Sequence, residues 1–173
     1  FLKDISAIAL KNECNDVEKL KGLTLENGET ISATLTNLIA TVGENMNIRR
    51  VQVMKVDNGA IAAYSHMGGK IGTLVVLEGA KSDKVTELGK DLAMHVAAAA
   101  PRYLHSSEVD VSELDVEKEI ARKKLIEEKK PENLIEKILE GQMKKFYKEV
   151  CLVEQMFVKD PNISITNVLK QSG

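Results

Sequence analysis

The chain has 173 residues, of which 43% are apolar but only 3% aromatic, with no Trp; this suits one domain or two small subdomains built on an aliphatic core. A formal net charge of -2 gives no basic excess to neutralise phosphates, and the few aromatic rings offer no stacking platform, so direct nucleic-acid binding is not expected. No apolar run reaches membrane-spanning length, so we do not expect an integral membrane protein. Cys14 and Cys151 lie outside any C-x-x-C pattern, which favours two free thiols in a reducing compartment over a disulfide or a metal-binding pair.

The first part of the chain predicts two helices. Residues 1–10 already have apolar residues at helical spacing, with no initiator Met or capping residue before them, so we expect a piece of a longer protein that begins just before or inside a helix. A polar stretch with turn signals follows at residues 12–29. The second helix is expected to begin after Thr30, a possible N-terminal cap, and to end at Gly43.

The next segment changes to the period of β-strands. Val51 and Val53 alternate with polar or less apolar neighbours, and residues 60–66 and 71–77 predict two further strands. The Gly-Gly pair at 68–69 is a two-residue turn signal of the kind that joins hairpin strands. We therefore expect an antiparallel meander of three strands.

Helical spacing returns after the strands. Apolar residues at Val85, Leu88, Leu92 and Val96 share one face, and a run of small residues precedes Pro101. Residues 90–97, KDLAMHVA, resemble residues 3–10 of the first expected helix, KDISAIAL. This weak internal repeat predicts that a sheet-plus-helix unit occurs twice.

The last third of the chain is strongly charged and predicts a helical hairpin. Residues 112–149 interleave both signs of charge around thin apolar stripes, and Pro131 suits the first turn of a new helix. Two antiparallel helices joined by a tight turn are expected to stand partly clear of the core. A final helix is expected around Ile165, with Ser164 or Thr166 as its cap.

Residues that carry out catalysis are not evident in the sequence. The three His residues are not spaced with other metal ligands, and the glycines before Lys70 lack the spacing of a phosphate-binding loop. No nucleophile with an adjacent base stands out. We therefore expect neither an enzyme nor a bound cofactor.

Five segments, in chain order, resemble the signature segments of the elongation factor Ts family. They are GENMNIRR at 43–50, YSHMGGKIGTLV at 64–75, DLAMHVAA at 91–98, GQMKKF at 141–146 and FVKDP at 157–161. One such segment would be weak evidence, but five in the family's order are specific. The resemblance runs from residue 1 nearly to the end of the chain.

The resemblance implies an α+β fold with antiparallel three-stranded sheets packed against helices, two related subdomains and a projecting helical hairpin. Residues 1–43 would be the remainder of the N-terminal core subdomain. Residues 44–111 and 147–173 would form the C-terminal core subdomain with its sheet, and residues 112–146 the coiled-coil insertion. The family's small N-terminal helical domain and Thr-Asp-Phe motif would lie before residue 1.

The resemblance also implies a function, namely guanine nucleotide exchange on the GTPase elongation factor Tu, in the bacterial cytoplasm or an organelle matrix. Such a factor releases GDP because it binds the nucleotide-free GTPase more tightly than the loaded one. Without the Thr-Asp-Phe motif, we expect docking with weaker exchange. A family tendency to form a homodimer through the core is a further expectation. The alternative is a coiled-coil interaction or oligomerisation module without exchange activity.

Six residues are implied as contacts with the partner. They match the partner-facing hairpin, the interface histidine, the C-terminal contact segment and a possible interface cation: Ile71, Gly72, His95, Phe157, Val158 and Arg49. Taken alone, a lone His on an Ala-rich helix is more often a packing residue, and Arg49 could equally pair with a carboxylate. From the motif we expect His95→Ala to weaken binding without unfolding the domain.

Overall fold

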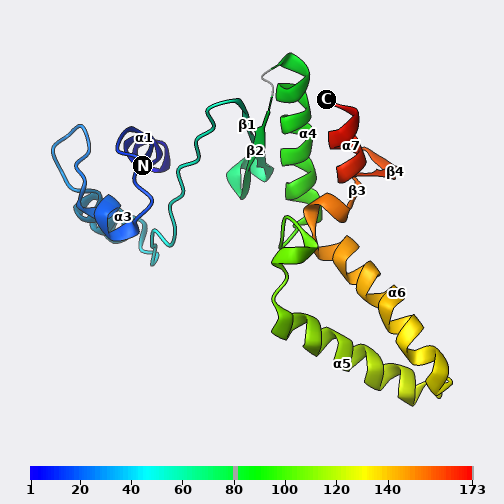
Figure 1. The fold of residues 1–173 in the computed structure, drawn as a ribbon. Coiled ribbons are helices and arrows are strands. Elements are labelled where there is room, and N and C mark those ends of the chain that lie inside the picture. Colours follow the sequence, from blue (N-terminus) through cyan, green and yellow to red (C-terminus); the bar gives the residue numbers. More distant parts are fainter. Residues whose placement is uncertain (80–81, 173) are drawn as a thin grey trace. The chain divides into compact units, whose positions relative to one another are not determined.

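The computed structural model describes residues 1–79 and 82–172, which form two compact units, Phe1–Lys55 and Val56–Gly173. The chain combines α-helices with small antiparallel sheets, in agreement with the predicted α+β class, and Figure 1 labels these elements. In the described part of the chain, no helix is long and apolar enough to cross a membrane. The subdomain boundaries expected from the sequence remain a prediction.

Three helices make up the first unit: α1 (Leu2–Lys11), α2 (Val17–Gly22) and α3 (Ile31–Val42). The ends of α3 are those predicted. Thr30 accepts a hydrogen bond from the Ala33 N–H, and Gly43 ends the helix at φ 76° in the left-handed region that glycine tolerates best.

Helix α2 lies inside the polar stretch in which no helix was expected. It begins after Asp16, whose carboxylate accepts a hydrogen bond from the Lys19 N–H at 2.7 Å. A helix of six residues has too few apolar positions to produce a clear period, so only its cap signals it. Its residue Leu20 is almost fully buried.

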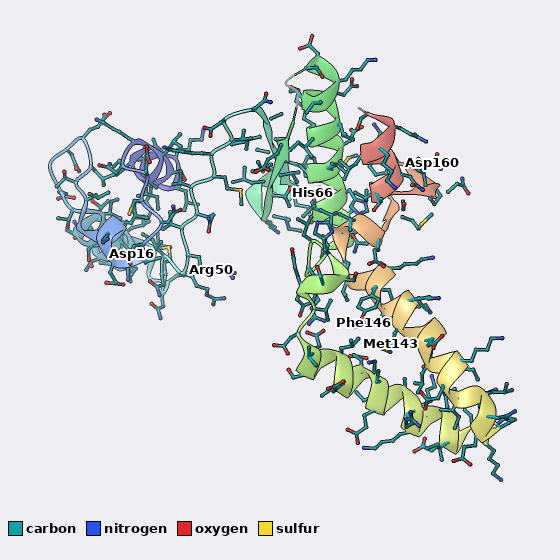
Figure 2. The ribbon with its side chains drawn as sticks, in the orientation of Figure 1. Asp16, Arg50, His66, Met143, Phe146 and Asp160 are labelled. Carbon is teal, nitrogen blue, oxygen red and sulfur yellow. The ribbon has the colours of Figure 1, made fainter. Side chains whose placement is uncertain are left out.

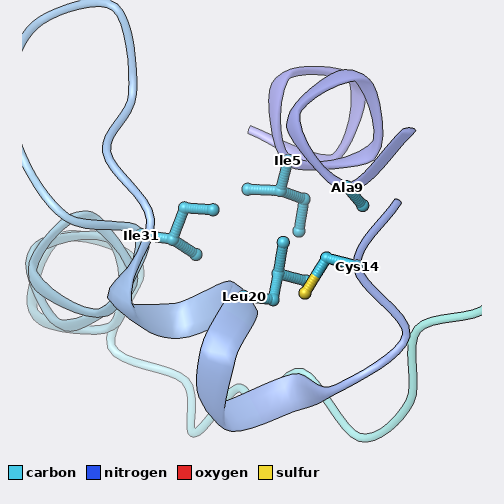
Figure 3. Packing of buried hydrophobic residues seen from close by; sticks show 5 residues of the cluster. All are labelled: Ile5, Ala9, Cys14, Leu20 and Ile31. Atoms are coloured by element: carbon cyan, nitrogen blue, oxygen red, sulfur yellow. The ribbon is translucent and has the colours of Figure 1, made fainter. Parts of the chain in front are cut away.

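The core of this unit joins all three helices and the chain between them. Figure 3 shows its buried members, which are Ile5, Ala9, Cys14, Leu20 and Ile31. They are aliphatic apart from one thiol, as the composition predicted. Both cysteines of the chain are free and buried thiols.

The expected first strand of the meander is not a strand, and the three-stranded prediction is wrong. Residues 43–58 form no helix or strand. Ile48, Val51 and Val53 instead pack against the helical core of the first unit, and the Val53 N–H donates to Oδ1 of Asn15. Because helices cover these apolar side chains, the alternating pattern is satisfied without pairing to a neighbouring strand.

The second unit opens with a two-stranded antiparallel sheet. Strands β1 (Gly59–His66) and β2 (Ile71–Glu78) pair over their whole length, from Gly59 opposite Glu78 to His66 opposite Ile71. Because pairing stops at His66 and Ile71, four residues connect the strands, including the 3-10 turn η1 (Met67–Gly69), and the predicted two-residue turn is wrong. The Gly-Gly pair supplies two positive φ angles within this longer loop.

Helix α4 (Asp83–Ala99) covers one face of this sheet. Gly89 faces Ala62, and a Cβ added to Gly89 would lie only 2.9 Å from the Ala62 Cβ. Thr73 of β2 donates a hydrogen bond to the carbonyl oxygen of Ala93 at 2.7 Å. Small residues therefore bring helix and sheet into close contact, and a side-chain hydrogen bond fixes their register.

Helices α5 (Val111–Glu127) and α6 (Glu132–Val150) occupy the segment where a helical hairpin was predicted, and they pack against each other. Near the turn, a small apolar cluster holds them together: Leu125, Ile135 and Leu139. Figure 2 labels Met143 and Phe146 on α6, farther from that turn.

The chain then returns to α4 through short elements that the sequence did not separate. They are the 3-10 turn η3 (Leu152–Glu154), β3 (Met156–Phe157), β4 (Asp160–Ser164) and α7 (Ile165–Gln171), capped by Ser164. Leu92, Phe157 and Ile165 form a common core, to which β2 adds Val75 and Leu77. Helix α4 thus packs against the β1–β2 hairpin and against the C-terminal elements (Figure 1).

We predict opposite effects of the same substitution at two helical glycines. Ala has a higher helix propensity than Gly by up to about 1 kcal/mol. Gly141→Ala in α6 should therefore raise the melting temperature, since beyond the adjacent backbone of the helix itself no atom lies within 4 Å of the added methyl group. Gly89→Ala should lower stability by about 1–3 kcal/mol, because its methyl group would clash with Ala62.

Thermal and urea unfolding of the two variants measure this difference. If Gly89→Ala were as stable as Gly141→Ala, the close approach of α4 to β1 would be contradicted.

Candidate functional site

His95 lies at the centre of the second unit, on α4, with only 1% of its surface exposed. Its Nδ1 atom accepts a hydrogen bond from the backbone N–H of Val158 at 3.2 Å. Because that backbone group can only donate, Nδ1 carries no proton, and Nε2 carries the proton of the neutral ring. The Nε2–H then donates to Oε1 of Gln155 at 2.9 Å.

Gln155, also buried, links this histidine to the end of α6. Its Nε2 atom donates to the carbonyl oxygen of Glu149 at 2.8 Å, in the last turn of α6. The backbone carbonyl oxygen of Gln155 accepts a hydrogen bond from the Ile165 N–H at the start of α7. A buried amide with its donor and acceptor satisfied stabilises the fold instead of costing desolvation energy.

The segment after Gln155 alternates between the core and the surface. Phe157 is buried, with its ring centroid 6.1 Å from that of His95, whereas Met156 and Val158 on either side are exposed. A register shift between Met156 and Phe157 interrupts the β3–β4 pairing at this point. The Val158 side chain, 49% exposed, therefore projects from a backbone that α4 holds in place.

An ion pair fastens the same segment to α4 one residue later. Lys159 Nζ lies 2.8 Å from a carboxylate oxygen of Asp91. The hydrogen bond to Asp91 and its negative charge raise the pKa of Lys159 above its usual range. Both groups are partly exposed, so this pair orients the loop more than it stabilises the fold.

Ile71 and Gly72 open strand β2 and are both exposed, Ile71 at 41%. They pair with His66 and Ser65, and the hydrogen bond of the next residue, Thr73, to Ala93 holds this end of the hairpin against α4. No atom lies within 4 Å of a Cβ added at Gly72. Internal packing therefore does not require glycine here, and the position is open to another chain.

Five of the six predicted contact residues lie in one compact unit. His95, Phe157 and Val158 form one contiguous group, and Ile71 and Gly72 lie on the hairpin that packs against the same helix. Arg49 is exposed and belongs to the other compact unit, Phe1–Lys55. His95 itself is buried and supports the backbone of Val158 within this chain, and its contact with a partner stays a prediction.

Sequence reasoning missed Gln155 and the pairing of Lys159 with Asp91. Gln155 stands beside Glu154 between two apolar pairs, Leu152–Val153 and Met156–Phe157. An uncharged polar side chain costs less to bury than a charged one, so of these two residues Gln155 is the better candidate for a buried hydrogen-bonding role. Its partners, however, are 60 and 6 residues away, and no local spacing identifies them.

This arrangement offers apolar side chains and backbone for contact. Within residues 1–79 and 82–172, no group of three or more His, Cys, Asp or Glu side chains could hold a metal ion. What Ile71 and Val158 offer is exposed apolar side chains on a backbone held by hydrogen bonds to α4.

Comparison with known proteins identifies the family. The family model described as "Elongation factor TS" matches residues 1–173. The chain belongs to the elongation factor Ts family. It is 45% identical over 171 residues to "Elongation factor Ts" of Magnetococcus marinus (strain ATCC BAA-1437 / JCM 17883 / MC-1), which covers 98% of this chain and 56% of that protein. Against "Elongation factor Ts" of Syntrophotalea carbinolica (strain DSM 2380 / NBRC 103641 / GraBd1), it is 43% identical over 176 residues, covering 100% of this chain and 58% of that protein.

The elongation factor Ts resemblance inferred from the five segments is thereby confirmed. The chain spans between half and two thirds of the length of these relatives. All five segments lie within the matched residues, including those that carry His95 and Val158.

The burial of His95 changes what its substitution is expected to do. His95→Ala removes two hydrogen bonds and leaves Oε1 of Gln155 and the Val158 N–H without protein partners, so we predict a loss of about 2–4 kcal/mol in the free energy of unfolding. His105→Ala, at an exposed position, should change it by less than about 0.5 kcal/mol. Urea denaturation of the two variants makes this comparison, and equal stabilities would contradict the structural role of His95.

Proposed function

We propose that this chain carries part of the surface with which an elongation factor Ts protein binds the GTPase elongation factor Tu, and that this binding promotes the release of GDP. Family membership supports the proposal, and the observation that carries it is the exposure of Val158 and Ile71 on a backbone fixed by buried contacts. The proposed compartment is the bacterial cytoplasm.

The proposed mechanism requires no covalent chemistry. A factor that binds the empty GTPase more tightly than the GDP-bound GTPase lowers the affinity for GDP by the same ratio, because the two equilibria are linked. A factor with equal affinity for both states would change nothing, however tightly it bound. Each tenfold increase in this affinity ratio corresponds to a difference of about 1.4 kcal/mol between the free energies of binding to the two states.

The fixed backbone around Val158 favours such selectivity. His95 binds the backbone N–H of Val158, and Asp91, also on α4, pairs with the next residue, Lys159. Because the segment is already held in place, little conformational entropy is lost when a partner docks. A rigid surface fits one conformation of its partner better than another, and it can stabilise the conformation that holds nucleotide poorly.

The chain alone is proposed to be a weaker exchange factor than a full-length relative. It spans 56% and 58% of the two relatives' lengths, and the family's Thr-Asp-Phe motif is not in its sequence. Contacts from outside the chain would add to those described here, so the docking step and the full rate of release can be separated experimentally.

A stopped-flow assay of fluorescent GDP release from elongation factor Tu tests the proposal. The wild-type chain should accelerate release, and Ile71→Glu should reduce this acceleration about tenfold or more, because it places a charge in an apolar contact. Leu2→Glu is the control, since Leu2 is 74% exposed on the first turn of α1, where an acidic residue is favourable.

Circular dichroism should show both variants folded. Self-association of the chain with no effect on GDP release, and with no stable nucleotide-free complex, would favour the alternative of a coiled-coil oligomerisation module. An equal loss of activity in both variants would show that Ile71 has no specific role.

A further inference from the structure

We propose that Gln155 is a positioning residue for the binding surface: it fixes the tautomer of His95 and thereby the backbone of Val158, linking this segment to the last turn of α6. The inference rests on the proposed function, because the surface that Gln155 positions is the one proposed to contact the GTPase. Gln155 is not among the residues that the family resemblance implied.

A series of hydrogen bonds runs from the Glu149 carbonyl through Gln155 and His95 to the Val158 N–H, and the groups at its two ends determine the direction of each bond. The carbonyl oxygen of Glu149 can only accept, so the amide NH2 of Gln155 faces it at 2.8 Å and Oε1 faces His95. At the other end, the Val158 N–H can only donate, so Nδ1 of His95 must accept. The two requirements agree on one arrangement, with the imidazole proton on Nε2.

Loss of the amide would remove one of the two hydrogen bonds that select the tautomer, so the form with the proton on Nδ1 would become accessible. With a proton on Nδ1, the ring would point an N–H at the N–H of Val158, and two donors would face each other. The Val158 backbone would then lose its contact with α4 at the point where the β3–β4 register shifts. Gln155 therefore acts on Val158 through His95, without touching the surface itself.

The same chain of contacts connects the helical hairpin to the surface. Glu149 lies in the last turn of α6, where backbone carbonyls lack partners within the helix, and Gln155 supplies a donor to one of them. A change in the position of this helix end would be transmitted through one amide and one imidazole to Val158. The neighbouring hydrogen bond of Thr166 to the carbonyl of Val153, at 2.6 Å, also secures the C-terminal segment but does not touch His95.

Three variants of the 173-residue chain separate positioning from simple stabilisation. Gln155→Met removes both hydrogen bonds at similar size. Gln155→Glu keeps an acceptor for the Nε2–H of His95 but loses the donor to the Glu149 carbonyl, and Thr166→Val removes a hydrogen bond of the same segment elsewhere. Nitrogen-15 NMR of the His95 ring reports the tautomer, and surface-immobilised nucleotide-free elongation factor Tu reports the affinity.

We expect the wild type to show a single tautomer with the proton on Nε2. Gln155→Met should show a mixture of tautomers and about three- to tenfold weaker binding, the range for one hydrogen bond. Gln155→Glu should recover the wild-type tautomer and most of the affinity. Thr166→Val should lower the melting temperature but change neither the tautomer nor the affinity.

Four results would overturn the inference alone: wild-type affinity in Gln155→Met, a single unchanged tautomer in Gln155→Met despite weaker binding, a Gln155→Glu variant no better than Gln155→Met, or an equal loss of affinity in Thr166→Val. Failure of the wild type to bind the nucleotide-free GTPase is distinguishable from these, because it would overturn the proposed function and the inference with it.

Discussion

The packing of the second unit depends on close contacts on two sides of helix α4, one with the β1–β2 hairpin and one with the C-terminal segment. On one side, Gly89 has no side chain, and this allows Ala62 and the β1–β2 hairpin to pack against the helix. On the other, His95 meets Phe157 and Val158 from the C-terminal segment. A bulkier residue at the first position would displace the sheet, and an apolar residue at the second would leave buried polar groups without partners. Ile71 and Val158, the two exposed residues proposed to contact the partner, are both held in place through this one helix.

The role proposed for this surface is recognition. Ile71 and Val158 expose aliphatic side chains, His95 and Gln155 are engaged in internal hydrogen bonds, and the Asp91–Lys159 pair orients a loop. A protein that works through differential affinity needs shape and rigidity at its contacts more than reactive side chains. The His95–Gln155 pair fits this requirement, since it uses two side chains that elsewhere carry out acid-base or amide chemistry purely to fix a backbone position.

The sequence predicted those features that depend on local signals. Thr30 and Gly43 marked the ends of α3, the strands on either side of the Gly-Gly pair were placed correctly, and Pro131 separated the two hairpin helices. The prediction was wrong where contacts between distant residues determine the structure. Val51 and Val53 have the alternation of a strand, but helices of the first unit cover them. The hydrogen bonds of His95 to Gln155 and Val158 could not be predicted either, because these partners lie some 60 positions later in the chain.

The proposed exchange mechanism requires the chain to bind the nucleotide-free GTPase more tightly than the GDP-bound one, and a comparison of the two dissociation constants measures this difference. Isothermal titration calorimetry can measure binding of the 173-residue chain to nucleotide-free elongation factor Tu and, separately, to the GDP-bound form in excess GDP. Under this mechanism, the chain should bind the empty form more tightly by a factor within or above the range of about 5- to 150-fold typical of linked sites. Equal dissociation constants for the two forms would contradict it.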